Sequence, residues 1–560
     1  MRLTLKRTDL YYVKWTPITG AQLKKYRIIR SSVSCVKILT LLLNLIFQYF
    51  LCLSSQICKG MNEHISMNPN PVVQYLNKPA DQLTKADLIK YIEDNDIEMI
   101  NFRYVGWDGR LKTLNFIIGG REHLENILTA GERVDGSSLL PFVEAGSSDL
   151  YVIPRYKTAF VNPFSEIPTL DIMCSYYDRN GDPLPGAPEN VLKKAHQSFQ
   201  DVTGYQFEAM GELEYYIISE DDGLFKADDQ KGYHESSPYS KWGNFRTEAM
   251  KLIAEAGGMI KYGHSEVGNF AKDGLVYEQN EIEFLPTCVE DAADQLVKAK
   301  WIIRTLAAHY GVTVTFAPKI TVGKAGSGLH VHTRIMDKGK NKMIEKGELS
   351  NIAKTAIAGY MELAPSITAF GNMNPTAYFR LVPHQEAPTN ICWGDRNRSV
   401  LVRVPLGWTT PVNMIHKVNP QESGDVIDFS NKQTVEVRSP DGSADIYLLL
   451  AGITVAARHG FEIDNPLEVA KKTYVDINIF DEENKKKQEE LDQLPTSCVE
   501  SASRLLEQKD IYLKYDVFPE AVINLLVSML ESRDDEGLIG RIQNDDEKVM
   551  ELVTKYFNCG

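Results

Sequence analysis

A glycine-rich turn followed by alternating residues, at positions 323–334, constrains the fold of this chain more than any other stretch. His330, His332 and Arg334 are spaced two residues apart, so in a β-strand their side chains point to one face of the sheet. The glycines before them let the backbone come close to a neighbouring group. A histidine pair on a strand is more often structural than functional, so other stretches must supply partners before a site can be inferred.

Three further stretches carry acidic side chains that alternate with apolar ones. Glu212 and Glu214 share one face of an expected strand at 205–219, whose flanking residues are apolar. Glu281 lies in a second expected strand, and Glu436 shares a face with its neighbours in a third. Carboxylates at this spacing repel each other unless solvent or a cation screens them. The apolar flanks indicate that these carboxylates are partly enclosed.

Glu266 adds a further acid, in a stretch at 263–268 that we expect to be a glycine-flanked loop. One concave sheet face would then collect five or more carboxylates and one or two histidines. Hard divalent cations such as Mg²⁺ or Mn²⁺ prefer oxygen ligands and would compensate this charge. No cysteine accompanies these residues, which argues against a structural zinc site.

Positive charge collects in a later region of the chain, which carries Arg380, Arg396, Arg398, Arg403 and Arg438. Arginine binds carboxylates and phosphates through two parallel hydrogen bonds. Metal ions combined with arginines are typical of phosphoryl transfer, in which catalysis is mainly positioning and charge neutralisation. The glycine-rich turn lacks the Lys-Ser/Thr of a Walker A motif, so a nucleotide would bind in a different cradle.

The overall charge excludes some classes of protein. The chain has 560 residues and a net charge of −14, and no basic stripe indicates a nucleic-acid binder. Eight scattered cysteines without a C-x-x-C pair favour a reducing compartment.

The first 66 residues are basic and contain an apolar run at 38–53, shorter than the about 20 residues of a membrane span. They could be a membrane anchor, a signal sequence, or a translated region before a start at Met61 or Met67. We favour the third reading and a cytoplasmic protein, because phosphoryl transfer needs a cytosolic cosubstrate.

The alternation of helical and strand patterns predicts an α+β fold. We expect three segments: an extension at 1–66, an N-terminal domain at 67–182 and a catalytic domain at 183–560 that is mostly helical after residue 445. Expected helices lie at 84–95, 188–202, 245–256, 289–309 and 349–370. Expected strands lie at 97–104, 111–118, 205–219, 278–285, 312–320, 399–404 and 433–438.

A set of short motifs, in order from about Asn70 to the end, resembles the glutamine synthetases of bacterial type I. The motifs are Asp135-Gly-Ser-Ser138, Gly211-Glu-Leu-Glu214, Gln279-Asn-Glu281, Gly326-Ser-Gly-Leu-His-Val-His332, Asn374-Pro-Thr376, Arg380-Leu-Val-Pro383, Glu386-Ala-Pro388, Arg396-Asn-Arg-Ser399 and Val435-Glu-Val-Arg438. The resemblance implies a small β-grasp domain and a large catalytic domain with a curved antiparallel sheet flanked by helices. It also implies homo-oligomers of stacked hexameric rings, with active sites between adjacent subunits.

The resemblance assigns roles to individual residues. Two or more Mg²⁺ or Mn²⁺ ions would bind six side chains, one ion at Glu214, Glu266 and Glu281 and another at Glu212, His330 and Glu436. The nucleotide phosphates would face His332, Arg398 and Arg403. The substrate glutamate would be bound by Gly326, Arg380 and Arg438. Ammonium would be bound and deprotonated by Asp135 beside Ser138, both from the neighbouring subunit, under a flap that carries Glu386.

The implied reaction is the ATP-dependent ligation of ammonia to glutamate through γ-glutamyl phosphate, which must be shielded from water. A γ-glutamyl ligase acting on another amine is an alternative, although the carboxylates of Asp135 and Glu386 suit ammonium better than a larger amine. A non-catalytic structural relative is a second alternative, but a scaffold would not need all six metal ligands. A membrane-anchored binding protein is a third, and it rests only on residues 1–66.

Two positions depart from the family's pattern. Ala325 stands where the family usually has asparagine, and Thr434 stands where it has an arginine that contacts the nucleotide. Lys432 is a candidate replacement for that arginine. The stretch between Glu266 and Glu281 is also longer than in the best-known bacterial forms.

The tyrosine that some bacterial forms adenylylate aligns with Phe480, which has no hydroxyl group. We therefore expect no adenylylation. Incubation with an adenylyltransferase and ATP should leave the mass of the protein unchanged in mass spectrometry, and an added nucleotide would contradict this expectation.

Overall fold

The computed structural model describes residues 11–12, 27–28, 65–226, 228–382, 389–405, 413–424 and 429–560. The chain divides into two compact units, Met1–Asn68 and Pro69–Gly560. In the first unit, strands β1 (Tyr11–Tyr12) and β2 (Arg27–Ile28) pair antiparallel. The apolar run at 38–53 and Met61 lie outside the described residues. Within the described ranges, no helix is both long and apolar enough to cross a membrane.

The N-terminal part of the second unit is a six-stranded sheet in the order β4-β3-β8-β6-β5, with β7 paired to β8. Its strands are β3 (Met99–Val105), β4 (Leu111–Ile117), β5 (Glu132–Asp135), β6 (Asp149–Pro154), β7 (Phe160–Val161) and β8 (Thr169–Tyr177). Its α-helices are α2 (Pro71–Leu76), α3 (Lys85–Asp94) and α4 (Arg121–Ala130). Strands β3 and β8 run parallel, and their buried residues, such as Phe102 and Ile172, join α3 and α4 in a core of their own.

The rest of the second unit is built on a ten-stranded sheet in the order β10-β11-β9-β14-β20-β19-β18. Its long strands are β9 (Gln206–Glu220), β10 (Ile260–Lys272), β11 (Leu275–Phe284) and β14 (Leu329–Asp337). The short strands on its path are β18 (Trp393–Asp395), β19 (Val402–Val404) and β20 (Val435–Val437), while β12 (Thr287–Cys288), β13 (Thr313–Thr315) and β15 (Lys340–Asn341) pair at its sides. A separate hairpin joins β16 (Ile344–Glu345) and β17 (Glu348–Leu349).

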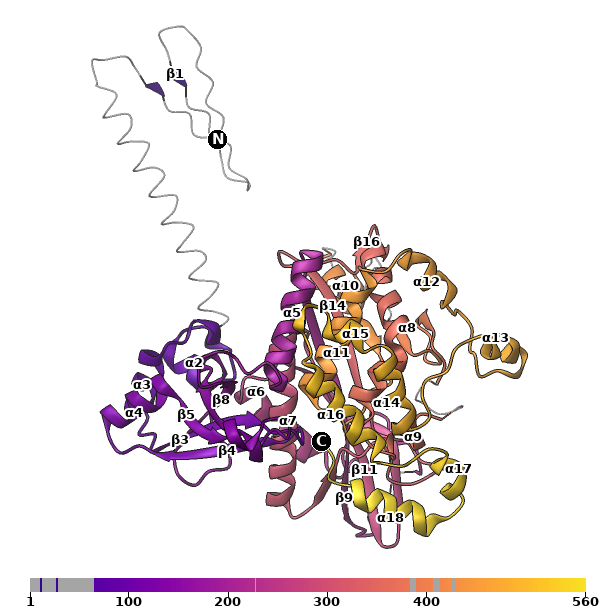
Figure 1. Ribbon diagram of the computed structural model, residues 1–560, viewed down its shortest axis with the longest axis horizontal. Coiled ribbons are helices and arrows are strands. Elements are labelled where there is room, and N and C mark those ends of the chain that lie inside the picture. Colours follow the sequence, from indigo (N-terminus) through magenta and orange to yellow (C-terminus); the bar gives the residue numbers. More distant parts are fainter. Residues whose placement is uncertain are drawn as a thin grey trace. The chain divides into compact units, whose positions relative to one another are not determined.

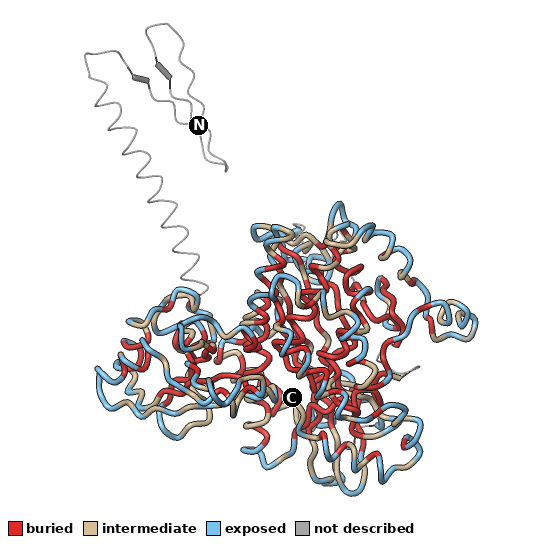
Figure 2. Tube along the Cα trace, in the orientation of Figure 1, coloured by how far each residue is buried: buried red, intermediate tan, exposed pale blue. Residues whose placement is uncertain are grey.

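Some helices, such as α7, contact strands of this sheet, and others pack on those helices or lie at the periphery toward the end of the chain (Figure 1). They are α5 (Pro188–Thr203), α6 (Gly243–Glu255), α7 (Val289–Tyr310), α8 (Asn351–Gly371), α9 (Ala377–Arg380), α10 (Met414–Val418), α11 (Ile446–Gly460), α12 (Pro466–Lys472), α13 (Lys485–Glu489), α14 (Cys498–Glu507), α15 (Lys509–Leu513), α16 (Glu520–Glu531), α17 (Leu538–Ile542) and α18 (Asp546–Tyr556). Figure 2 shows the buried segments that form the interior between helices and sheet.

Local sequence signals set several of these boundaries as expected. Thr84 and Asp87 form a reciprocal capping box at the start of α3. Pro188 opens α5, and Gly204 ends it in the left-handed conformation. Gly311 ends α7 in the same way. The predicted α+β class is confirmed, and the chain after residue 445 is mostly helical.

The structure corrects three predictions. Glu266 lies in strand β10 and not in a loop: it sits in a bulge between Ser265 and Asn269, and β10 pairs with β11 on both sides of that bulge. The large sheet is mixed and not wholly antiparallel, since β18 and β19 run parallel. The expected strand at 312–320 is only β13, because Pro318 cannot donate to a ladder and its carbonyl oxygen instead accepts from the Ser327 amide (3.0 Å).

Helices α8 and α11 cross with their backbones in contact. A Cβ atom added at Gly359 would lie 1.9 Å from the Ala456 carbonyl oxygen, and one at Gly460 would lie 2.1 Å from that of Thr355. Only glycine permits so close an approach of two helices. This crossing fixes α11, which follows β20 directly in the chain.

We expect Gly359→Ala to destabilise the protein by about 1–3 kcal/mol, the usual cost of overpacking a core. Gly540→Ala is the matched control, because a Cβ atom there meets open space in helix α17. Thermal unfolding should show a lower melting temperature for Gly359→Ala alone. Equal melting temperatures for the two variants would contradict the backbone contact.

Candidate active site

Strand register places acidic and histidine side chains of the large sheet next to each other. His330 on β14 lies opposite Glu212 on β9, and Glu212 lies opposite Glu283 on β11. Glu281 lies opposite Glu214. Because each pair shares a face, side chains from strands far apart in the sequence meet on one polar surface.

Glu212, His330 and Glu436 offer ligand atoms that all lie within 4.8 Å of one another. His330 Nδ1 lies 3.0 Å from Glu212 Oε2 and 3.6 Å from Glu436 Oε1. The structure therefore brings together the three residues that the family resemblance assigned to one metal. All three are more than four-fifths shielded from solvent.

His332 lies in the same cluster and not apart from it. Its Nε2 is 2.9 Å from Glu212 Oε1, and its Nδ1 is 2.8 Å from Thr434 Oγ1. Glu212, Glu283 and His332 form a second group with the spacing of metal ligands. The role of His332 toward phosphate, implied by the resemblance, stays a prediction.

The other predicted metal set is brought together in part. Glu266 and Glu281 group with His264, whose Nε2 is 3.4 Å from Glu281 and whose Nδ1 is 3.7 Å from Glu266. Glu214 Oε2 accepts from the Gly328 amide (2.8 Å) and from Gln279 Nε2 (3.0 Å), and Glu214 Oε1 lies 4.0 Å from His330. Glu214 thus lies between the two groups.

The electrostatics of the cluster show uncompensated negative charge. Burial, together with Glu212, Glu214, Glu266 and Glu283, raises the pKa of Glu281 well above its usual range. Burial lowers the pKa of His330, which keeps its ring neutral at pH 7.

Buried carboxylates beside neutral imidazole form a donor set suited to divalent cations of the Mg²⁺ and Mn²⁺ class.

Glu212 and Glu436 are stabilised as anions by their neighbours. Burial opposes this, but His332 and then His330 lower the pKa of Glu212 well below its usual range. In return, Glu212 and Glu436 raise the pKa of His332 against the effect of its burial. The two histidines therefore differ: His332 is charged more readily than His330.

Two arginines form ion pairs with Glu436. Arg403 Nη1 lies 2.8 Å from Glu436 Oε2, and Arg438 Nε lies 3.0 Å from Oε1. Arg438 also donates to the carbonyl oxygen of Arg398, whose residue is exposed. Arg380 is buried and donates to the carbonyl oxygens of Ser439 (2.9 Å), Pro440 and Arg438, with Nη2 3.3 Å from His330 Nε2.

The glycines before His330 allow close packing. A Cβ atom at Gly326 would lie 2.5 Å from the Pro318 carbonyl oxygen, and one at Gly328 would lie 2.5 Å from Arg380 Nη2. The Gly326 carbonyl oxygen accepts from Gln279 Nε2 (3.0 Å). Because these two residues have no side chain, the turn packs directly against Arg380. This agrees with the sequence, in which the glycines allow a close approach of the backbone to a neighbouring group.

Asp135 and Ser138 lie elsewhere, after strand β5 of the N-terminal sheet. Asp135 accepts from the Ser138 hydroxyl (2.7 Å) and from the hydroxyl and amide of Ser137. These hydrogen bonds lower the pKa of Asp135 to about 2. Among the described contacts, none joins Asp135 to the carboxylate cluster of the same chain.

Three further predicted positions have different outcomes. Glu386 lies outside the described residues. Ala325 is held by its backbone, which donates to Gln230 Oε1 (2.7 Å) and accepts from the Tyr216 hydroxyl (2.8 Å). Lys432 lies over the ring of Phe429, with its Nζ 4.6 Å from the ring centroid.

A fourth group with metal-like spacing, His196, Cys288 and Glu290, fits a structural role better. His196 Nε2 accepts from the Phe207 amide (3.2 Å), so the ring proton lies on Nδ1 and is donated to Glu290 (2.9 Å). With both nitrogens engaged, the ring has no lone pair left for a metal. The contacts instead tie α5 to β9 and to the start of α7.

Sequence reasoning missed three members of the site. His264 lies two residues before Glu266, and Glu283 lies two residues after Glu281, so the spacing rule could have found both. Thr434 departs from the family's sequence pattern, and in the structure it is a hydrogen-bond partner of His332. No spacing within one strand predicts that contact, because it joins two strands.

A polar sheet face with clustered carboxylates, histidines and arginines defines a metal- and anion-binding class of site. The sequence matches the family described as "Glutamine synthetase, catalytic domain" over residues 185–536, and "Glutamine synthetase, beta-Grasp domain" over residues 96–179. The chain belongs to the glutamine synthetase family. The predicted β-grasp domain and large catalytic domain are thereby confirmed, with the sheet mixed as described above.

Named relatives agree with this membership. The chain is 30% identical to a glutamine synthetase of Methanococcus maripaludis, with 73% of this chain and 87% of the relative covered. It is 27% identical to a glutamine synthetase of Aquifex aeolicus, covering 81% and 96%.

Solved structures share the fold. A Plasmodium falciparum glutamine synthetase matches with a TM-score of 0.66 and 21% identity over 81% of this chain and 96% of that one. A complex of GmaS with ADP matches with a TM-score of 0.63 and 19% identity, over 80% and 96%.

Proposed function

We propose that this protein ligates ammonia to L-glutamate, using ATP and passing through γ-glutamyl phosphate. The observation that supports the proposal is that five of the six proposed metal ligands lie on the neighbouring strands β9, β11, β14 and β20 of one sheet, and the sixth, Glu266, lies on β10 of the same sheet, in a chain of this family. Its partners would be glutamate, ammonium and ATP, in the cytoplasm where ATP is available. The working form would be a homo-oligomer, with stacked hexameric rings as the expected arrangement.

Six residues would hold Mg²⁺ or Mn²⁺, two or more ions in each site: Glu212, Glu214, Glu266, Glu281, His330 and Glu436. When bound, these ions would neutralise the phosphates and polarise the transferring phosphoryl group. The chain's own part is to keep His330 neutral by burial and Glu212 ionised through His332, so that both are ready as donors.

Arginines would position the two anionic substrates. Arg403 and Arg438 both contact Glu436, so each guanidinium lies beside the proposed metal site. Arg398 and Arg403, with His332, would face the nucleotide phosphates. Arg380, Arg438 and the Gly326 turn would hold glutamate. The γ-carboxylate oxygen of glutamate would attack the terminal phosphorus of ATP and release ADP.

Ammonium would bind at Asp135 from a neighbouring subunit, since Asp135 is remote from the cluster of its own chain. A pKa of about 2 keeps Asp135 ionised, which suits it to attract a cation. The same low pKa makes Asp135 a weak base, so electrostatic binding is its stronger contribution. Ser138 holds the carboxylate in place (2.7 Å), and Glu386 would close over the intermediate.

A ligase for another amine is the second candidate. The chain shares its fold with GmaS as well as with a glutamine synthetase, and the fold alone does not determine which amine is ligated. Phosphate release by the full-length protein with ATP, Mg²⁺ and glutamate separates the two. We expect a rate that depends on ammonium and is at least about tenfold lower with methylamine, since its methyl group replaces one N–H donor of ammonium and would leave a polar group of the pocket unpaired. An equal or higher rate with methylamine would favour the second candidate.

The metal assignment can be tested by binding alone. We expect Glu212→Gln to weaken Mn²⁺ binding at least about tenfold in calorimetry, because even groups that only support a ligand contribute that much. Glu290→Gln is the matched control, since Glu290 is a carboxylate of the His196 group and should leave the affinity unchanged. Loss of affinity in the control but not in Glu212→Gln would refute the assignment.

A further inference from the structure

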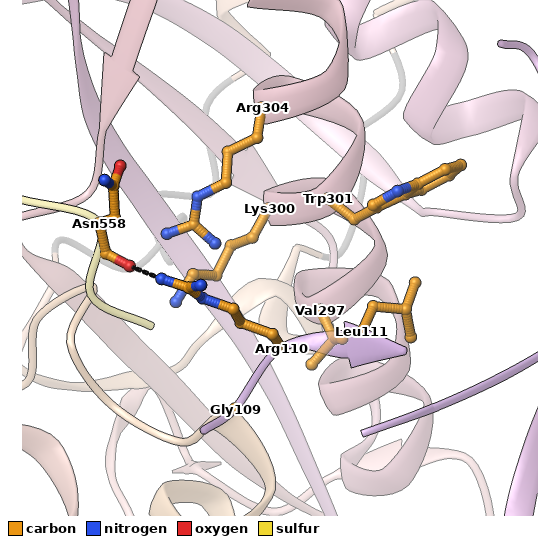
Figure 3. A pocket seen from close by; sticks show the side chains of 8 residues that line it. All are labelled: Gly109, Arg110, Leu111, Val297, Lys300, Trp301, Arg304 and Asn558. Atoms are coloured by element: carbon orange, nitrogen blue, oxygen red, sulfur yellow. Dashed lines mark hydrogen bonds between the residues drawn. The ribbon is translucent and has the colours of Figure 1, made fainter. Parts of the chain in front are cut away.

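A cavity lined by positive charge lies between the start of β4 and helix α7 (Figure 3). Its volume is about 310 Å³, and its walls include Arg110, Lys300, Arg304, Trp301, Leu111 and Asn558. None of these residues belongs to the site described above. The volume is near the lower limit of pockets that enclose small molecules.

Three cationic side chains meet in this cavity. Lys300 and Arg304 are four residues apart on α7, so they share one face of the helix. Arg110 follows Gly109, which takes a positive φ of 71° and turns the chain into β4. Figure 3 shows the three charged groups directed into the same space. Lys300 is only 3% exposed, so its charge is withdrawn from solvent.

The partners of these cations are backbone oxygens. Lys300 Nζ donates to the Gly442 carbonyl (2.8 Å), and Arg304 Nη2 donates to that of Cys559 (2.7 Å). Arg304 also donates to Gly560 O, and Arg110 donates to Asn558 O. No carboxylate side chain in the described ranges forms an ion pair with any of the three. A carboxylate at Gly560 would add one negative charge against three positive ones.

Some other shielded cations of this chain are paired with carboxylates. Arg103 lies 2.6 Å from Asp171, and Arg155 lies 2.7 Å from Asp294. A buried charge without an opposite charge is costly. Lys298 and Arg246 are also buried with neutral partners, but in the cavity three cations with neutral partners meet at one place.

The cations of the cavity also repel one another. Burial and then Arg304 lower the pKa of Lys300 to about 7, although Cys559, Asp445 and Asp441 act in the opposite direction. Burial and then Arg110 lower the pKa of Arg304 to about 10, against Asp108. A bound anion would remove this repulsion. Such a local collection of positive charge is notable in a chain of net charge −14.

We propose that this cavity binds a small organic dianion, either a dicarboxylate or a phosphate ester. Two guanidinium groups and one ammonium group match two carboxylates or one phosphate. Leu111 and Trp301 supply apolar wall, which favours an organic molecule over a bare ion. The ligand would join β4 of the N-terminal sheet to α7 of the catalytic part. The proposal does not depend on the proposed reaction, because its test is binding.

The test is calorimetry of the full-length protein with two probes, succinate and phenyl phosphate, without glutamate, because glutamate is itself a dicarboxylate and would compete for the cavity. Succinamide is the neutral control for succinate. We expect one probe to bind and succinamide not to bind. Arg110→Gln and Lys300→Met should each weaken that binding at least tenfold, whereas Arg179→Gln, an exposed arginine outside the cavity, should leave it unchanged.

The probe that binds identifies the class of ligand, and either result supports the proposal. Arg110 is exposed, so Arg110→Gln decides the question if Lys300→Met fails to fold, which its thermal unfolding will show. The proposal is overturned if neither probe binds the unaltered protein. It is also overturned if Arg110→Gln and Arg179→Gln bind the probe equally, because the probe would then occupy another place.

Discussion

Mutual repulsion among buried carboxylates is the constraint on which the rest of the catalytic part depends. Strand pairing brings Glu212 close to Glu436, and Glu281 close to Glu266, and burial removes much of the water that would screen them. The chain compensates part of this charge with its own cations. His332 and two arginines hold Glu212 and Glu436 as anions, while Glu281 keeps a raised pKa. The remaining imbalance is the physical reason to expect metal ions there.

The sequence predicted the components of this arrangement better than their contacts. A spacing of two residues placed Glu212 with Glu214, and His330 with His332, on common strand faces, and the structure has them so. Capping residues such as Thr84 and Gly311 located helix ends because their effect is local. Contacts between strands depend on register, which no single stretch encodes. For that reason the bond from Thr434 to His332 and the place of Glu283 opposite Glu212 went unpredicted.

Glu266 shows how local signals mislead. Glycines on both sides of it predict a loop, but pairing of β10 with β11 before Ser265 and after Asn269 keeps the stretch within the strand, with Glu266 in a bulge between them. Asp135 shows a different limit. Its own hydrogen bonds are visible in one chain, whereas under the proposed function it would serve residues of another subunit, whose contacts a single chain does not contain. The carboxylate cluster and Asp135 are thus separate charged sites. Under the proposed function, the cluster needs metal ions and Asp135 needs a second subunit.

The register in which β14 pairs with β9 couples correct folding of this protein to assembly of its site. Successive residues of β14 point to opposite faces, so a slip of one position would replace His330 and His332 by Leu329 and Val331 on the polar face. The same slip would force both imidazoles into the apolar interior. Catalytic assembly and hydrophobic burial are therefore satisfied by one alignment only. Substitutions that disturb this strand should therefore lower the fraction of molecules that fold correctly. The molecules that do fold should keep near-normal activity, and the misfolded ones should be degraded in the cell.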